Sequence, residues 1–355
     1  MSGDGWWAGR RVLLTGHTGF KGAWLGLWLH RLGARVTGFA GPPPTEPSLF
    51  ALAHLDELLD DRRGDVRDAA AVRAAAAACG PEVVFHLAAQ PLVRRGLADP
   101  AGTYATNVSG TAHLLDAVRA EAPEAAVVVV TSDKCYAAPG ARRCREDDPL
   151  GGRDPYSSSK AAQELVAAAY RDSLGLRIAT ARAGNVIGGG DWAEDRLVPD
   201  LVRAAFARRP LRLRDPDAVR PWQHVLNPLS GYLELARRLT GSAASARAFN
   251  FGPAAEDERP VRWVVERLAA RWPGGVDVGL DARDSAAVEA HALRLDSSRA
   301  REALGWAPRW RLAEALEAVV EWHAEVALGA DARAVTLAQL ERFALPRSAA
   351  SLQRR

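Results

Sequence analysis

A tyrosine and a lysine stand four residues apart in "DPYSSSKAAQELV", at Tyr156 and Lys160. Residues four apart lie on one face of a helix, and this stretch is typical of a helix. A tyrosine has an ordinary pKa of about 10, but a neighbouring ammonium favours the phenolate and lowers that pKa. We therefore expect Lys160 to make Tyr156 a general base that takes the proton of an alcohol, while Ser132 donates a hydrogen bond to the same oxygen.

A second group with acid–base potential follows the apolar run "AVVVVT" in the stretch "TSDKCY", where Asp133 stands beside Lys134. The chain has 46 lysines and arginines, and only Lys21, Lys134 and Lys160 are lysines. An ammonium is a compact donor whose pKa shifts readily on burial, whereas a guanidinium stays charged. A lysine kept in such a chain indicates a chemical role, against the alternative of a structural ion pair with Asp133 at a strand end.

A glycine-rich turn precedes both groups in "VLLTGHTGFKG", with Gly16, Gly19 and Gly22 between a predicted strand and a predicted helix. Glycines there permit a tight turn and close approach to a pyrophosphate, and the helix N-terminus offers free N–H groups. In this context the spacing predicts a dinucleotide site. Lys21, inside the motif, either is a solvated helix residue or reaches a phosphate.

The choice between NAD and NADP has a weaker signal. The second predicted strand ends in "GFAGP" at residues 38–42, without the acidic residue that usually holds the adenosine ribose. Asp65 and Val66 in "GDVRD" either contact the adenine edge or form an ordinary turn. No arginine in the loop at 38–42 offers to bind a 2′-phosphate, so we expect NAD.

Parallel strands must position these groups, and short apolar runs recur with helical stretches between them. The predicted strands are 11–16, 34–40, 82–89, 125–132 and 176–184. Continuous apolar strands alternating with helices predict an α/β fold, a Rossmann-type doubly wound parallel sheet with a smaller, mixed C-terminal substrate lobe. We expect these domains: 10–185 for NAD binding, with about 218–254 returning to it; 186–217 and 255–330 for the substrate lobe; 331–355 for a C-terminal helix and tail.

Composition limits the other functions. A net charge of +3, with 25% charged residues spread along the chain, argues against a nucleic-acid partner. Three cysteines without C-x-x-C spacing argue against a zinc site or disulfide framework and favour a reducing compartment. No apolar run reaches the roughly 18 residues of a membrane span, and no signal peptide is evident. We expect a cytoplasmic protein without a membrane or metal partner.

Over nearly its whole length the chain resembles the extended short-chain dehydrogenases/reductases. The motifs are T-G-x-x-G-x-x-G at 15–22, "HLAAQ" at 86–90, "NVSGT" at 107–111, Y-x-x-x-K at 156–160 and "RAGNVIGGGD" at 182–191. Within them it is most similar to the CDP-glucose 4,6-dehydratase family, through "GHTGFKGAWL", "PPTEPSLF", "TSDKCY", "GGGDWAEDRLVPD" and "RPWQHVLNPLSGYL". The resemblance implies a lyase that keeps NAD bound and converts CDP-D-glucose to CDP-4-keto-6-deoxy-D-glucose, a step of deoxysugar biosynthesis.

The implied reaction moves hydride from C4 of the sugar to NAD, eliminates water across C5 and C6, and returns hydride to C6. In the related dTDP-glucose dehydratases the strand end reads Thr-Asp-Glu, with Asp as acid and Glu as base. Here Ser132, Asp133 and Lys134 occupy these positions, so Asp133 keeps the role of acid. Lys134 departs from the dTDP pattern, and it acts either as a neutral base or as a cation that stabilises the enolate.

The resemblance also implies the binding residues and a homodimer formed through the helices after "NVSGT" and around Tyr156. For the cofactor it implies Gly16, Thr18, Gly19, Phe20, Gly22, Asp65, Val66, Leu87, Ala88, Ala89, Tyr156 and Lys160. For the nucleotide-sugar it implies Asn185, Arg196, Arg220 and His224, with Asn250 near the nucleotide. A buried histidine is more often part of the core, and Trp192 and Trp222 either wall the pocket or belong to the core.

Three other functions remain open from the sequence. A nucleotide-sugar 4-epimerase shares the glycine loop and the Tyr–Lys pair but has no use for an acid at Asp133. A dehydratase for another NDP-glucose fits equally, because no single residue reads cytosine. A non-catalytic NAD-binding regulator tends to lose the tyrosine or the lysine, and both are present here.

Overall fold

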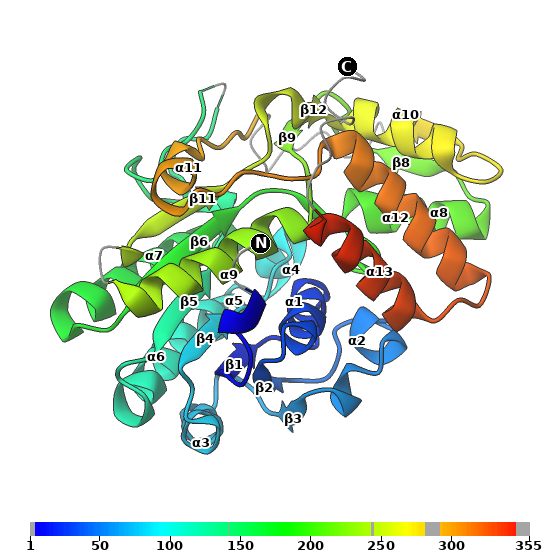
Figure 1. Ribbon diagram of the computed structural model, residues 1–355. Helices are drawn as coiled ribbons and strands as arrows, with labels where there is room; N and C mark the ends of the chain where they lie inside the picture. The colour runs from blue at the N-terminus through cyan, green and yellow to red at the C-terminus, as the bar shows by residue number, and fades with distance from the viewer. Residues whose placement is uncertain (1–3, 141, 243–244, 281–291, 346–355) are drawn as a thin grey trace.

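The computed structural model describes residues 4–140, 142–242, 245–280 and 292–345. At its centre lies a seven-stranded sheet whose neighbouring strands all pair in parallel (Figure 1). The strands are β1 (Arg11–Thr15), β2 (Arg35–Ala40), β3 (Asp60–Arg63), β4 (Val83–His86), β5 (Ala126–Val130), β6 (Ile178–Ala183) and β11 (Ala248–Phe251). Their spatial order is β11-β6-β5-β4-β1-β2-β3, which confirms the predicted doubly wound sheet. The order reverses between β1 and β4, where such sheets open a ligand crevice at their carboxyl ends.

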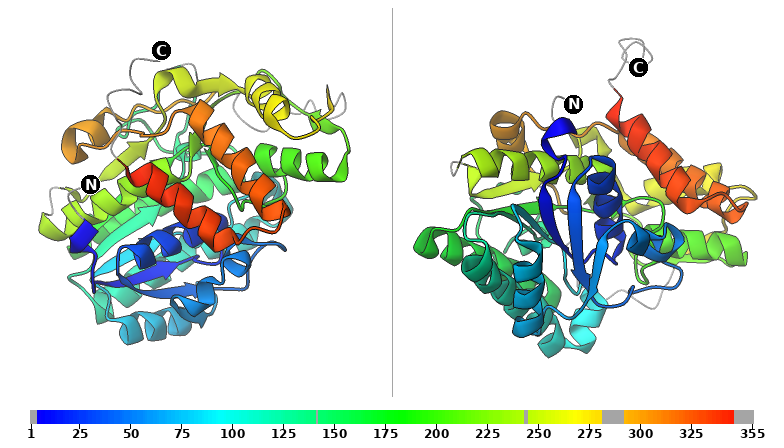
Figure 2. Two further views of the ribbon diagram at one scale, coloured as in Figure 1. Left: turned by 45° about the vertical axis from the view of Figure 1, so that its right-hand side comes forward. Right: turned by 60° about the horizontal axis from the view of Figure 1, so that its bottom comes forward.

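Helices cover both faces of the sheet (Figure 2). The α-helices of the described residues are α1 (Phe20–Arg31), α2 (Leu49–Leu52), α3 (Ala69–Cys79), α4 (Val93–Ala98), α5 (Pro100–Tyr104), α6 (Gly110–Glu121), α7 (Pro155–Leu174), α8 (Leu197–Ala207), α9 (Leu226–Gly241), α10 (Val261–Arg271), α11 (Ser298–Leu304), α12 (Leu312–Ala327) and α13 (Ala332–Ala344). Along β5, Val127 and Val129 pack with α3, α6 and α7, whereas Val128 and Val130 pack with α1 and α9. This alternation buries every residue of β5, as expected of a strand between two helical layers.

The strand β3 was not predicted from the sequence, because its residues, "DDRR", are all charged. It pairs with β2 at the edge of the sheet, where charged side chains are favoured. Its arginines reach back to its own aspartates: Arg62 pairs with Asp60 at 2.8 Å and Arg63 with Asp61 at 2.8 Å. Edge position and local ion pairs thus replace the apolar pattern that marks the inner strands.

The C-terminal part has a core of its own, made by α8, α10 and α12. Short strands join distant segments there: β7 (Val186–Ile187), β8 (Leu211–Leu213), β9 (Val219–Pro221), β10 (Gln223–His224), β12 (Glu258–Pro260) and β13 (Val278–Leu280). The pairs are β7 with β10, β8 with β13 and β9 with β12. The exact domain boundaries stay a prediction, and the expected tail at 346–355 lies outside the described residues. Among the described helices, none has the length and hydropathy that a bilayer crossing requires.

His323 of α12 offers a test of the C-terminal core. Its ring stacks on Trp192 with centroids 5.1 Å apart, and neither ring nitrogen has a hydrogen-bond partner in the described residues. Burial lowers the pKa of His323 to about 4. Because the folded-state pKa lies below the ordinary value, His323 leaves stability intact above pH 6.5 and reduces it as the pH falls toward 4.

We therefore expect His323→Phe to raise the free energy of unfolding at pH 5 by about 1–2 kcal/mol more than it does at pH 7.5. Urea unfolding at both pH values measures this difference. The matched control is Phe206→Leu on α8, which removes no titratable group and should change stability equally at the two pH values. Equal effects of His323→Phe at the two pH values would show that the buried ring is not the acid-sensitive group.

Candidate active site

The two predicted groups meet at the carboxyl end of β5. Ser132 and Asp133 follow the strand and open a 3₁₀ turn, Asp133–Cys135, in which Asp133 and Cys135 are buried. Tyr156 and Lys160 lie in the first turns of α7, and both side chains are buried. A hydrogen bond joins Tyr156 to Ser132, and the charge of Asp133 acts on Tyr156. The structure thus brings both predicted groups into one site.

The start of α7 is fixed by its cap. Pro155 occupies the first turn, and the Asp154 carboxylate accepts a hydrogen bond from the Ser157 backbone N–H at 2.9 Å. This pairing of a carboxylate cap with an N-terminal proline is a strong helix start. It sets the rotation of the helix that points Tyr156 and Lys160 toward β5.

A buried network behind Tyr156 was missed from the sequence. The side chain of Asn107 donates to Ser159 Oγ at 2.8 Å and to the Gln90 carbonyl at 3.1 Å, and it accepts from the Gln90 N–H at 2.8 Å. Asn107 lies in a π-helical stretch, Ala105–Ser109, just before α6. Hydrogen bonds therefore join the motifs "HLAAQ" and "NVSGT" to α7, and the polar residues of these motifs were the available signal in the sequence.

The structure corrects the expectation that Lys160 lowers the pKa of Tyr156. Burial raises the pKa of Tyr156 to about 12, while the hydrogen bond from Ser132 and the charge of Arg196 act in the opposite direction. The Lys160 ammonium is directed to the β5 carbonyl of Val130, with Nζ 3.3 Å from the oxygen. Desolvation dominates because the phenol lies in the protein interior. Ser132 is the side chain that hydrogen-bonds the Tyr156 hydroxyl.

Lys160 itself is perturbed more strongly. Burial lowers its pKa to about 7, and the charge of Lys21 lowers it further, whereas Glu164 opposes the shift. Glu164 follows Lys160 by one helical turn and is also buried. It accepts hydrogen bonds from Arg182 Nη2 at 2.8 Å, from Thr180 Oγ1 at 2.6 Å and from Thr131. The Glu164–Arg182 ion pair therefore joins α7 to β6 one helical turn after Lys160.

Glu164→Gln should strongly destabilise the protein, because it leaves the buried guanidinium of Arg182 without its carboxylate. We expect the free energy of unfolding to fall by about 3–5 kcal/mol. The control is Glu124→Gln, which removes an exposed ion pair to Arg177 ahead of β5 and β6, and whose cost should stay below about 1 kcal/mol. Urea unfolding at pH 7 measures both variants, and equal losses would contradict the role assigned to the buried pair.

The Asp133 carboxylate lies close to the backbone of Gly184, the residue that follows β6. A Cβ atom on Gly184 would come within 2.9 Å of Asp133 Oδ2 and 2.3 Å of Pro221, so the glycine makes room for the carboxylate. Ser132 donates to Asp133 Oδ1 at 3.1 Å, and the Lys134 N–H donates to Ser132 Oγ at 3.2 Å. Lys134 is half-buried in the same turn. A carboxyl and a lysine thus stand next to the Tyr156–Ser132 pair.

The glycine loop has the shape that a dinucleotide pyrophosphate needs. Gly16 has a φ of +77°, and a Cβ there would lie 2.6 Å from the Ala88 nitrogen. A Cβ on Gly22 would lie 2.1 Å from the Gly16 carbonyl oxygen. The close approach of Gly16 places the loop against "HLAAQ", and α1 begins after Gly19 without a side-chain cap, which leaves its first N–H groups without a side-chain partner, as pyrophosphate binding requires. The residues fit NAD.

Other predicted cofactor residues surround this loop. Ala88 N–H donates to Thr15 Oγ1 at 3.3 Å, and Leu87 N–H donates to the Thr15 carbonyl at 3.1 Å. Val66 is buried beside Gly110, whereas the Asp65 carboxylate is exposed and pairs with Arg67. The buried ring of His17, inside the loop, bonds Asp61 of β3 at 2.7 Å, which sequence reasoning did not foresee.

Three of the predicted substrate residues, Asn185, Arg196 and Arg220, lie in or near the short strands and loops of the C-terminal part. Arg196 pairs with Asp191 at 3.0 Å, and its charge acts on Tyr156 and Lys21, so it lies in their neighbourhood. Asn185 accepts a backbone hydrogen bond from Gln223 at the junction of β7 and β10. Arg220 is buried in β9. The ring of Phe20 lies beside Gly188, where a Cβ atom would come within 3.1 Å of it.

His224 and two tryptophans belong to the core. The ring of His224 is fully buried between Trp24 and Trp310, with centroid distances of 5.7 and 4.7 Å. Burial lowers the pKa of His224 to about 3. Trp192 stacks on His323, and Trp222 Nε1 donates to the Arg259 carbonyl at 2.9 Å. Of the two alternatives left by the sequence, the packing favours the core for all three.

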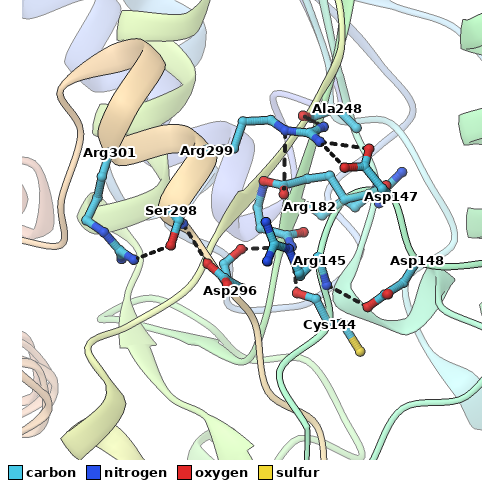
Figure 3. A network of polar contacts seen from close by, with 12 residues as sticks. Cys144, Arg145, Asp147, Asp148, Arg182, Ala248, Asp296, Ser298, Arg299 and Arg301 are labelled. Atoms are coloured by element: carbon cyan, nitrogen blue, oxygen red, sulfur yellow. Dashed lines mark hydrogen bonds and ion pairs between the residues drawn. The ribbon is translucent and has the colours of Figure 1, made fainter.

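A polar network holds the loop that follows the 3₁₀ turn Asp133–Cys135 (Figure 3). Arg299 of α11 pairs with Asp147 at 2.6 Å and donates to the Ala248 carbonyl at 3.2 Å, and Arg182 donates to the Glu146 carbonyl at 3.1 Å. Asn250 of β11 is buried and donates to the carbonyls of Cys144 and Asp296 at 3.0 and 3.1 Å. Asn250 therefore serves to hold this loop.

Known proteins share both the sequence and the fold. A family model described as GDP-mannose 4,6-dehydratase matches residues 13–319. A CDP-glucose 4,6-dehydratase of Salmonella typhimurium is 47% identical over 334 residues, which cover 91% of this chain and 93% of that protein. A dTDP-glucose 4,6-dehydratase of Streptomyces griseus is 32% identical, covering 88% and 93%. A solved dTDP-glucose 4,6-dehydratase double mutant from Streptomyces venezuelae with bound NAD superposes with a TM-score of 0.75 at 25% identity, covering 89% of this chain and 97% of that one.

Proposed function

We propose that this chain, which belongs to the GDP-mannose 4,6-dehydratase family, is an NAD-dependent lyase that converts CDP-glucose to CDP-4-keto-6-deoxyglucose. The observation that carries the proposal is the meeting of the oxidising pair, Tyr156 and Ser132, with the carboxyl of Asp133 in one buried site. The relative from Salmonella typhimurium supports CDP as the nucleotide. The sequence similarity to that relative covers 91% of this chain.

The cofactor supplies a hydride acceptor at C4 and a hydride donor at C6 when it is bound. Gly16, Gly19 and Gly22 would hold its pyrophosphate at the start of α1. Tyr156 takes the proton of the C4 hydroxyl, and Ser132 stabilises the phenolate through their hydrogen bond. Because burial raises the pKa of Tyr156, that hydrogen bond matters for the oxidation.

The elimination uses the residues of the 3₁₀ turn. Once C4 is a ketone, the C5 proton becomes acidic, and the C6 hydroxyl needs a proton to leave as water. Asp133 donates that proton to the leaving hydroxyl, the electrons of the C5–H bond form the C5–C6 double bond, and the C5 proton passes to a base beside Asp133, for which Lys134 is one alternative. Hydride then returns to C6, and a solvent proton is added at C5. No electron is gained or lost overall, so the cofactor ends as it began.

The nucleotide specificity is tested with purified protein and equal concentrations of CDP-, dTDP-, UDP- and GDP-glucose. We expect the 4-keto-6-deoxy product from CDP-glucose at a rate at least tenfold above the others, since each tenfold step needs only about 1.4 kcal/mol of difference in binding. A faster reaction with another NDP-glucose would change the substrate assigned to the protein but would not contradict the dehydratase reaction.

Two chemical roles are possible for Lys134: a base, or a cation that stabilises the enolate. Lys134→Met should slow elimination by about 10²–10³-fold, because it removes either a base or a stabilising cation, while C4 oxidation continues. Lys134→Glu separates these roles, since a carboxylate can replace a base but opposes an enolate. Single-turnover absorbance of NADH follows the oxidation, and product formation follows the elimination. If Lys134→Met eliminates water at the wild-type rate, both chemical roles are excluded, and only a structural ion pair with Asp133 remains as the role of Lys134.

Two further properties are part of the proposal. We propose a homodimer through α6 and α7, which is supported by the exposed apolar side chains of Leu165 and Leu174 on α7. We also propose a cytoplasmic location. The three cysteines support this location, because all are buried as free thiols.

A further inference from the structure

The 3₁₀ turn Asp133–Cys135 leaves the central sheet after β5, and its two ends are held in different ways. At the upstream end, the Thr131 N–H donates to the Ala181 carbonyl of β6 at 3.0 Å, which continues the hydrogen bonding of the sheet. The Thr131 hydroxyl also donates to the Glu164 carboxylate of α7. Ser132, the partner of the tyrosine base, therefore follows a residue that both the sheet and α7 hold.

The downstream end of the turn pairs instead with a loop. Tyr136 forms an antiparallel bridge with Leu150, in the segment that precedes α7. Next to this bridge, the Ala137 N–H donates to the Pro149 carbonyl at 2.9 Å. Because these backbone contacts lead to a loop, the position of the downstream end relative to the sheet depends on side chains.

The hydroxyl of Tyr136 connects this end to the sheet. It donates to Asn250 Oδ1 of β11 at 2.7 Å and accepts from Arg182 Nη1 of β6 at 3.0 Å. Asn250 and Arg182 are direct neighbours in the pairing of β6 with β11. The tyrosine ring is buried, and its centroid lies 5.0 Å from Arg182 Cζ, within the range of a cation–π contact. Burial raises the pKa of Tyr136, so the hydroxyl keeps the proton that it donates.

One buried ion pair contacts both ends of the turn. Arg182 Nη2 donates to Glu164 Oε2 at 2.8 Å, and both side chains are only 3% exposed. The Thr131 hydroxyl binds the carboxylate of this pair, and the Tyr136 hydroxyl binds its guanidinium. Because Glu164 belongs to α7, these contacts fix the turn relative to the helix that carries Tyr156.

Building on the proposed dehydratase function, we propose that Tyr136 is a positioning residue for the elimination step. Its hydroxyl fixes the downstream end of the 3₁₀ turn, and with it the side chains of Asp133 and Lys134, relative to the sheet and α7. The upstream end, which leads to Ser132, is held by contacts that do not involve Tyr136. Loss of the hydroxyl therefore disturbs elimination more than oxidation, whereas a purely structural tyrosine would affect both steps alike.

Tyr136→Phe keeps the ring and removes both hydrogen bonds of the hydroxyl. In a single turnover of the NAD-loaded variant with CDP-glucose, we expect NADH to form at close to the wild-type rate per bound NAD. Elimination should slow by about 10–100-fold, because small displacements of a reacting group cost this much, so NADH should accumulate and persist. Replacing Tyr136 with 4-aminophenylalanine, whose amine can donate to Asn250, should recover part of the elimination rate.

Hydrogen exchange provides a second readout that needs no substrate. In NAD-loaded Tyr136→Phe, the backbone amides of residues 134–137 should exchange about tenfold faster than in the wild type, whereas those of β5 should not change. The matched control is Tyr170→Phe near the C-terminal end of α7, whose hydroxyl contacts the Ala112 carbonyl at 3.5 Å. This control should change neither the exchange nor the two rates.

Three outcomes would overturn the inference. The first is an elimination step that is slowed no more than the oxidation, and the second is unchanged exchange at residues 134–137. The third is a Tyr136→Phe protein that does not fold or does not retain NAD, which would show a general structural role. If the wild type forms no keto product, the proposed function fails instead, and hydrogen exchange still decides whether Tyr136 fixes the turn.

Discussion

Asp133→Asn is expected to stop the reaction after C4 oxidation. The amide is nearly isosteric with the carboxyl, so the room left by Gly184 and the contact with Ser132 should be retained. It cannot donate the proton that the C6 hydroxyl needs, and we expect kcat to fall by about 10²–10⁴-fold, the usual contribution of a general acid. In a single turnover with CDP-glucose, NADH should form and persist, together with a 4-keto sugar that keeps its C6 hydroxyl.

The control for this variant is Asp116→Asn on α6, where the carboxylate is exposed and pairs locally with Arg119. It should behave as the wild type. Unimpaired dehydration by Asp133→Asn would exclude the carboxyl as the acid and would place the proton donor elsewhere in the site. Loss of NADH formation in Asp133→Asn would instead show that the carboxyl takes part in oxidation.

Tyr156→Phe is expected to prevent the oxidation itself. Phenylalanine keeps the buried ring at the start of α7 and removes the hydroxyl that accepts the C4 proton. We expect kcat to fall by about 10²–10⁴-fold, with no NADH signal in a single turnover and no change in bound NAD. The double variant with Asp133→Asn should also form no NADH, because oxidation precedes elimination.

Tyr104→Phe provides a matched control on the neighbouring helix α5. Its hydroxyl is exposed and contacts Ser158 Oγ at 2.6 Å, so it lies near α7 but outside the buried site. Its loss should change kcat by less than about threefold, since surface changes of this kind usually amount to about 0.5 kcal/mol. Rapid NADH formation by Tyr156→Phe would contradict the assignment of the base.

The sequence predicted the features that depend on local pattern. Continuous apolar runs marked the five inner strands, and the glycine turn marked the start of α1. The spacing of Tyr156 and Lys160 placed them on one face of α7. These predictions succeeded because a strand that is buried between two helical layers must be apolar on both faces, which gives a continuous apolar run in the sequence. β3, at the sheet edge, escapes that code because its side chains are charged.

Features that depend on distant contacts could not be predicted. Glu164 and Arg182 are ordinary charged residues in the sequence, and only the packing of α7 against β6 buries them together. His224 looks like a site residue in its motif, yet Trp24 and Trp310, from opposite ends of the chain, enclose it. The pKa of Tyr156 also depends on desolvation, which a four-residue spacing does not contain.

The reaction is tested most directly by incubating the protein with CDP-glucose in deuterated water and examining the product by NMR. The proposed sequence of oxidation, elimination and hydride return predicts CDP-4-keto-6-deoxyglucose with one solvent deuterium at C5 and no net NADH. The deuterium reports removal of the C5 proton, the step that the groups beside Asp133 are placed to perform. A C4 epimer of CDP-glucose without deuterium at C5 would contradict the dehydratase assignment and would identify an epimerase.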